Sequence, residues 1–112
     1  MDERTRRVGR NEAIFRAVNE QIESLNQNLA AISDNTVRIV CECADLMCSE
    51  QLSVRVEEYE RIRADSTLFF VLPGHQLPDL ERVVEETADY VVVRKHAGEP
   101  ATVARETDAR AG

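Results

Sequence analysis

The chain has 112 residues, the size of one small domain, and its 43% hydrophobic and 31% charged residues are typical of a soluble globular protein. Its formal net charge of −7 argues against a general nucleic-acid-binding protein, because such a protein needs a basic face to neutralise phosphates. No apolar run approaches the roughly 20 residues of a membrane-spanning helix, and no signal-peptide-like segment begins the chain, so we expect a cytoplasmic protein with no membrane partner.

The two ends of the chain differ in composition from its middle. The first ten residues contain the arginines Arg4, Arg6, Arg7 and Arg10. We expect residues 1–10 to be a flexible basic arm, and an arm that binds phosphate or an acidic protein is the alternative. From Ala97 the chain is rich in Ala, Gly, Thr and Glu, which predicts a flexible tail over residues 97–112. A single domain is therefore expected over residues 11–96.

Residues 11–33 have the spacing of a helix with an apolar seam. Apolar side chains recur every seven residues in two series: Val8, Phe15, Ile22 and Leu29, and Val18, Leu25 and Ile32. Asn11 interrupts the second series. The flanking positions carry no charge, whereas dimeric coiled coils choose partners through charge pairs there. We therefore expect this helix to pack on the protein's own sheet; a homodimer or a protein partner bound through a coiled coil is the alternative.

The middle of the chain alternates between strand and helix patterns. Residues 36–43 alternate and are rich in β-branched side chains, so they predict a strand, and residues 52–54 predict a short partner strand. Residues 56–65 return to helical spacing. Residues 68–72 form an apolar run that a Pro-Gly pair ends, which indicates a buried strand.

Residues 81–96 are compatible with two structures. Residues 81–87 fit either a helix with Asp79 as its N-cap or the first arm of a hairpin. We prefer the hairpin, because Tyr90–Val93 is strongly strand-like and needs a neighbouring strand. The expected fold class is therefore α+β: a long N-terminal helix with a small, mostly antiparallel sheet, one further helix and a metal knuckle.

The three cysteines of the chain, Cys41, Cys43 and Cys48, lie within eight residues. Cys41 and Cys43 are two residues apart near the end of a predicted strand, so their side chains point to the same side. Cys48 returns across a four-residue loop. Three thiolates and one imidazole are a common tetrahedral ligand set for Zn²⁺. The spacing therefore predicts a Cys₃His zinc site.

The fourth ligand must come from elsewhere in the chain. We expect it to be His75, because the preceding Pro-Gly turn fixes the backbone beside it. His96 is the second candidate and Asp45 the third. A closed set of four protein ligands leaves no open coordination position, so the predicted zinc is structural and not catalytic.

Other interpretations of the cysteines stay open. The thiols can be reduced core residues without a metal, or a redox switch. Three cysteines and a histidine can also hold iron, although the spacing matches none of the common ferredoxin patterns.

Four sequence segments together resemble a known family. They are C-E-C-A-D-x-x-C, E-Y-E-R-I-R, F-x-V-x-P-G-H and V-V-x-x-x-x-x-Y-V-V-V-x-K. They resemble a family of short, uncharacterised actinobacterial proteins over about Asn11–Lys95. That family typically has Gly where this chain has Ala44, and often Thr where it has Arg55. The resemblance implies that Cys41, Cys43, Cys48 and His75 act as one set, and it implies no activity.

The remaining residues indicate no catalytic chemistry. We find no phosphate-binding loop, no dinucleotide fingerprint and no nucleophile motif such as G-x-S-x-G. The glutamates within residues 57–60 and 81–86 are expected to form solvated faces. We therefore expect a small, non-enzymatic, zinc-stabilised protein-interaction module with a regulatory role. A thiol-based redox sensor is the first alternative, and a small metal-dependent enzyme is the second.

Overall fold

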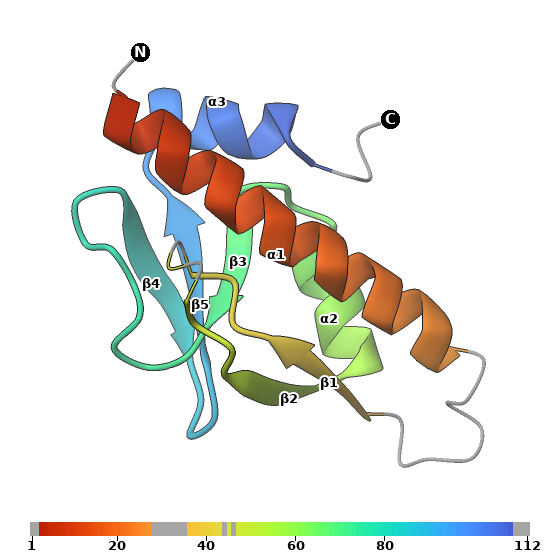
Figure 1. Ribbon diagram of the computed structural model, residues 1–112. Helices are drawn as coiled ribbons and strands as arrows, with labels where there is room; N and C mark the ends of the chain where they lie inside the picture. Colours follow the sequence, from red (N-terminus) through yellow and green to blue (C-terminus); the bar gives the residue numbers. More distant parts are fainter. Residues whose placement is uncertain (1–2, 28–35, 44, 46, 109–112) are drawn as a thin grey trace.

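The fold is described from a computed structural model, which covers residues 3–27, 36–43, 45 and 47–108, without the side chains of residues 24–27 and 99. In chain order the elements are α1 (Glu3–Gln27), β1 (Thr36–Val40), β2 (Gln51–Arg55), α2 (Val56–Arg63), β3 (Leu68–Val71), β4 (Glu81–Glu86), β5 (Val91–Lys95) and α3 (Glu99–Glu106). Helices and antiparallel strands are combined, so the fold class is α+β, as expected (Figure 1).

The described strands form two antiparallel sheets. β1 pairs with β2, and the second sheet has the order β3-β5-β4. β4 and β5 are the two arms of a hairpin, with an irregularity between Val83 and Glu85. The hairpin expected over residues 81–96 is confirmed, and the helix alternative for residues 81–87 is wrong. The β-branched run of β5 lies in the middle of its sheet, where it has a neighbour on each side.

The core lies between the two sheets and α2. All four residues of β3 are buried. Phe70 stacks on Tyr59 of α2 with ring centroids 5.8 Å apart, and it meets Tyr90 edge-on at 5.4 Å. Such aromatic pairs add to the stabilisation that burial alone provides. α2 begins after Arg55, which makes no capping hydrogen bond through its side chain. An arginine side chain has no oxygen that could accept one.

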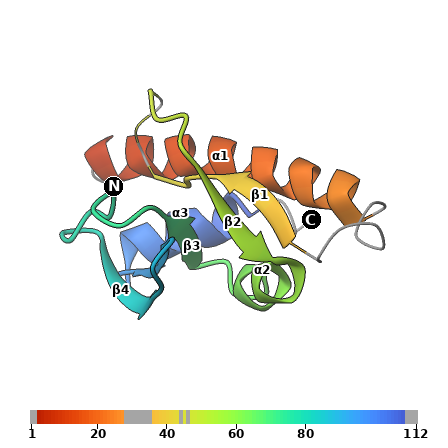
Figure 2. The same cartoon turned by 90° about the horizontal axis from the view of Figure 1, so that it is seen from below.

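Both ends of the described chain are helical, where the sequence predicts an arm over residues 1–10 and a tail over residues 97–112. α1 begins at Glu3, and Arg4 forms an ion pair with Asp79 of the loop before β4. At the other end, Pro100 stands in the first turn of α3, a position that favours helix initiation. α1 lies along one side of the molecule and packs on β1 and α3 (Figures 1 and 2).

Gly9 allows the close approach of α1 to α3. A Cβ atom at this position would lie 2.1 Å from Cγ1 of Val103, which is impossible without movement of a helix or of Val103. Glycine lowers the stability of a helix interior by about 1 kcal/mol relative to alanine. Here the absence of a side chain lets Val103 pack against the α1 backbone.

α1 packs on the body through a face different from the predicted one. Its buried residues are Thr5, Val8, Glu12, Arg16, Asn19 and Glu23, and most of them are polar. In the predicted seam, Val18 is 42% exposed and Phe15 and Ile22 are only partly buried. Leu25, Leu29 and Ile32 lie outside the described side chains. The helix does pack on its own chain, but among the described seam residues only Val8 is buried.

Two of the buried polar side chains of α1, Arg16 and Asn19, bond to the backbone of the body. Arg16 donates to the carbonyl oxygens of Ser66 and Ala104, each at 2.7 Å. The Asn19 amide donates to the Val40 carbonyl at 2.9 Å and accepts from the Val40 N–H at 2.8 Å. Asn19 therefore pairs with the backbone N–H and carbonyl groups at the end of β1, as a neighbouring strand would. For this reason a polar residue is favourable at this buried position.

Candidate metal centre

The structure brings the four predicted ligand residues together. One ligand atom each from Cys41, Cys43, Cys48 and His75 lies within 4.8 Å of the other three. Nδ1 of His75 is 3.6 Å from Sγ of Cys41 and 3.8 Å from Sγ of Cys48. With zinc bonds of about 2.0–2.3 Å, the edges of a tetrahedron are about 3.5–3.8 Å. The cluster is therefore close to the size of a tetrahedral zinc cage.

Cys41 and Cys43 reach the site because the chain stays extended after β1. β1 ends at Val40, earlier than the predicted Cys43, but Cys41 N–H still bonds the Glu50 carbonyl at 3.0 Å. The intervening Glu42 N–H bonds Phe70 of β3 at 2.8 Å. The Glu42 carboxylate is buried and accepts from the Phe70 N–H at 3.0 Å and from Asn19 at 2.8 Å. Through these hydrogen bonds, Glu42 connects the segment that carries Cys41 and Cys43 to β3 and to α1.

A turn returns Cys48 to the site. The Cys48 N–H donates to the Asp45 carbonyl at 3.0 Å. The Asp45 carboxylate accepts from the Met47 N–H at 2.9 Å, as in an Asx turn. Asp45, the third candidate for the fourth ligand, therefore stabilises the loop and is not one of the four clustered residues.

His75 is held by the tight turn that follows β3. Its N–H donates to the Leu72 carbonyl at 3.0 Å, and Gly74 has a φ of +92°, which side-chain-bearing residues rarely adopt. The Leu72 N–H donates to Sγ of Cys41 at 3.2 Å, as backbone amides do to thiolate ligands. His96, the second candidate, lies after β5 and lines a different pocket.

Burial governs the charge of the thiols. Removal from water raises the pKa values of Cys41 and Cys43 above their ordinary value. The Leu72 N–H opposes this effect at Cys41, whereas the neighbouring cysteines add to it. Three adjacent thiolates are therefore unfavourable without a compensating positive charge. A divalent cation supplies that charge and deprotonates its thiol ligands outright.

A shallow pocket connects the cluster to solvent. Its cavity volume is about 260 Å³, and Cys43, Asp45, Gly74, His75 and Leu77 line it. Cys41 and Cys43 are themselves buried, whereas Cys48 and His75 are partly exposed. The pocket gives a metal ion a path of entry to a site that is otherwise covered by protein.

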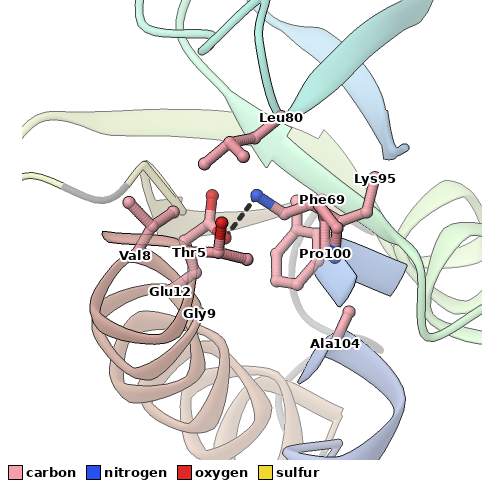
Figure 3. Close-up of a pocket in the computed structure, with 9 residues that line it drawn as sticks. All are labelled: Thr5, Val8, Gly9, Glu12, Phe69, Leu80, Lys95, Pro100 and Ala104. Carbon is pink, nitrogen blue, oxygen red and sulfur yellow. Dashed lines mark ion pairs between the residues drawn. The ribbon is translucent and has the colours of Figure 1, made fainter. Parts of the chain in front are cut away.

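A second cluster of charged side chains lies beneath α1 and has no sequence signature. Lys95 Nζ is 2.5 Å from Oε1 of Glu12 (Figure 3). It is also 2.6 Å from Oε2 of Glu81, and all three residues are buried. The acidic run over residues 81–86 predicts a solvated face, but Glu81 is buried and does not belong to one. The three residues come from separate elements, and their pairing depends on the tertiary fold.

Comparisons with family models, curated protein sequences and solved structures find no match to the chain. Within the described ranges, no helix combines the length and the apolar character that are needed to cross a membrane. The site itself is therefore the basis for the function that follows.

Proposed function

We propose that the chain is a small, non-enzymatic protein-interaction module whose fold is held by a structural zinc ion. The observation that carries the proposal is the convergence of Cys41, Cys43, Cys48 and His75 to within 4.8 Å. Thiolate and imidazole ligands favour zinc or iron over calcium and magnesium, which prefer oxygen. Zinc is proposed over iron because the cysteine spacing differs from the common iron–sulfur patterns.

A metal at this site would join three segments that are distant in sequence. Cys41 and Cys43 follow β1, Cys48 ends the loop before β2, and His75 follows β3. Structural zinc contributes on the order of 10 kcal/mol of folding free energy in small domains. The whole stability of a typical domain is roughly 5–15 kcal/mol. A zinc ion would therefore account for a large part of the stability of this chain.

The proposed interaction surface is the outward face of α1. Ile14 and Val18 are one helical turn apart and are 52% and 42% exposed. They lie on the face that the polar, buried residues leave free. A protein partner or a second copy of the chain, binding in the cytoplasm, would cover them. The resemblance to the actinobacterial family is compatible with such a role and adds no activity.

The metal part of the proposal is tested by removing the ion. Protein purified under reducing conditions should contain one zinc per chain, and chelation should lower its melting temperature and its secondary structure together. Re-addition of zinc should restore both. Metal-free protein with the same melting temperature before and after chelation would refute a structural zinc.

A redox sensor is the second candidate, because Cys48 is partly exposed and its sulfur lies beside two others. In this case hydrogen peroxide takes two electrons from two thiolates and two protons from the solvent; a disulfide forms, and two water molecules and the metal ion are released. Zinc release at low peroxide, reversed by a thiol reductant, would favour the sensor over the purely structural role.

A metal-dependent enzyme is the third candidate, because a pocket borders Cys43 and His75. It requires an open coordination position, and four protein ligands would leave none.

A further inference from the structure

A basic pocket lies where β5 ends and the chain turns into α3. Its lining includes Arg82 of β4, Arg94 of β5, His96, Arg105 of α3 and Thr67, and no described residue that lines it is acidic. Its cavity volume is about 340 Å³. Thr67 precedes β3, whereas His75 of the cysteine cluster follows it, so the two sites lie at opposite ends of this strand (Figure 1). A positive pocket is unexpected in a chain of net charge −7.

Two of the arginines face each other directly. Arg82 and Arg94 are cross-strand partners in the register of β4 and β5. Side chains of directly opposed residues project from the same face of a sheet, and like charges in these positions repel each other. Such a pair is unfavourable unless a negative charge lies between or beside the two guanidinium groups.

Among the described residues, a carboxylate pairs with one member of this pair. Arg94 donates to Oδ2 of Asp65 at 2.8 Å. The guanidinium groups of Arg82 and Arg105 are exposed and have no hydrogen bond or ion pair with any described residue. Two guanidinium groups therefore remain available around the pocket, next to the His96 imidazole and to Arg94.

We propose that this pocket binds a small phosphate-bearing molecule. Guanidinium groups present forked donors that match phosphate oxygens, and the two unpaired charges match the two charges of a phosphate monoester. The volume lies at the lower end of the roughly 300–1,000 Å³ of small-molecule sites, so the ligand is a small molecule. A nucleic acid is disfavoured, because the acidic remainder of the chain would repel its extended backbone.

Calorimetric titration of the full chain with inorganic phosphate tests this proposal. The wild type should bind one phosphate per chain saturably. Arg82→Gln and Arg105→Gln should each weaken that binding at least about tenfold, because each removes a charge-assisted hydrogen bond. Arg38 is an exposed strand arginine away from the pocket, so Arg38→Gln, which makes the same change in net charge, should alter it by less than about twofold.

Thermal unfolding gives a second measurement on the same proteins. Phosphate should raise the melting temperature of the wild type and of Arg38→Gln, and have little effect on the two pocket variants. Without ligand, all three exposed substitutions should keep the fold. Three results would overturn the proposal: no saturable phosphate binding to the wild type, equal weakening by Arg38→Gln, or acetate binding as tightly as phosphate.

Discussion

The carboxyl group of Glu12 should make the protein less stable as the pH rises. Glu12 lies on the inner face of α1, and apart from its ion pair with Lys95 its carboxylate has no hydrogen-bond partner among the described residues. Burial raises its pKa from 4.5 to about 8; Lys95 opposes the rise, and the second carboxylate, Glu81, adds to it. One ammonium group thus serves two buried carboxylates, and the fold favours a protonated Glu12.

The size of the effect follows from proton linkage. Because the folded-state pKa is the higher one, the folded chain binds the proton more tightly than the unfolded chain does. The resulting stabilisation is complete below pH 4.5, the ordinary pKa, and is lost as the pH rises through 8. Inside this window, each pH unit lowers the free energy of unfolding by about 1.4 kcal/mol. Between about pH 5 and pH 7.5 the loss from Glu12 amounts to about 3 kcal/mol.

Urea unfolding at a series of pH values tests this reasoning against two variants. Glu12→Gln keeps the shape of the side chain without its charge, so it should remove most of the decline. Glu86→Gln alters an exposed glutamate of β4 and should follow the wild type. Contributions from the cysteines are common to all three proteins and cancel in the difference. Parallel profiles for the wild type and Glu12→Gln between pH 5 and pH 7.5 would refute the account of this cluster.

Three further predictions concern α1 and the metal centre. Gly9→Ala should destabilise the chain by about 1–3 kcal/mol in urea unfolding, because its Cβ would meet Val103; adding Val103→Ala should recover part of the loss, and full additivity would contradict the contact. His75→Ala removes one of four ligands, about a quarter of the roughly 10–16 kcal/mol of zinc binding, so it should lower the free energy of unfolding by about 3 kcal/mol and remove most of the zinc. His96→Ala should change both very little. The reverse ranking in metal analysis would transfer the role to His96. Ile14→Asp should change stability by less than about 0.5 kcal/mol yet abolish association in sedimentation, and unchanged association would exclude this face of α1 as the interface.

Local patterns in the sequence predict the strands and the cysteine cluster well. Alternation and β-branched residues identify β1, β2 and the β4–β5 hairpin, because strand pairing depends on those same features. The short spacing of the cysteines, together with the rigid turn before His75, predicts which side chains converge. The strand patterns, the cysteine spacing and the turn before His75 each depend on residues close together in the chain, where local geometry limits the possible structures. The approach of His75 to the cysteines joins distant segments and depends on the fold.

The docking of α1 cannot be predicted in the same way. The seven-residue repeat indicates Val18 as a buried position, whereas Arg16 and Asn19 are buried instead. Their burial is favourable only because carbonyl groups of β1, α3 and the chain before β3 lie opposite them, and such partners are specified by the tertiary fold. The start of α3 did have a local signal in Pro100, but the small, polar residues around it favour a tail.

The most direct test of the central claim is X-ray absorption at the zinc edge of the protein purified under reducing conditions. The account predicts one zinc per chain with three sulfur ligands at about 2.3 Å and one nitrogen ligand at about 2.0 Å. In His75→Ala the nitrogen contribution should disappear, while in His96→Ala it should remain. A spectrum dominated by oxygen ligands, a site of four sulfurs, or protein that contains no zinc would contradict a structural Cys₃His centre formed by Cys41, Cys43, Cys48 and His75.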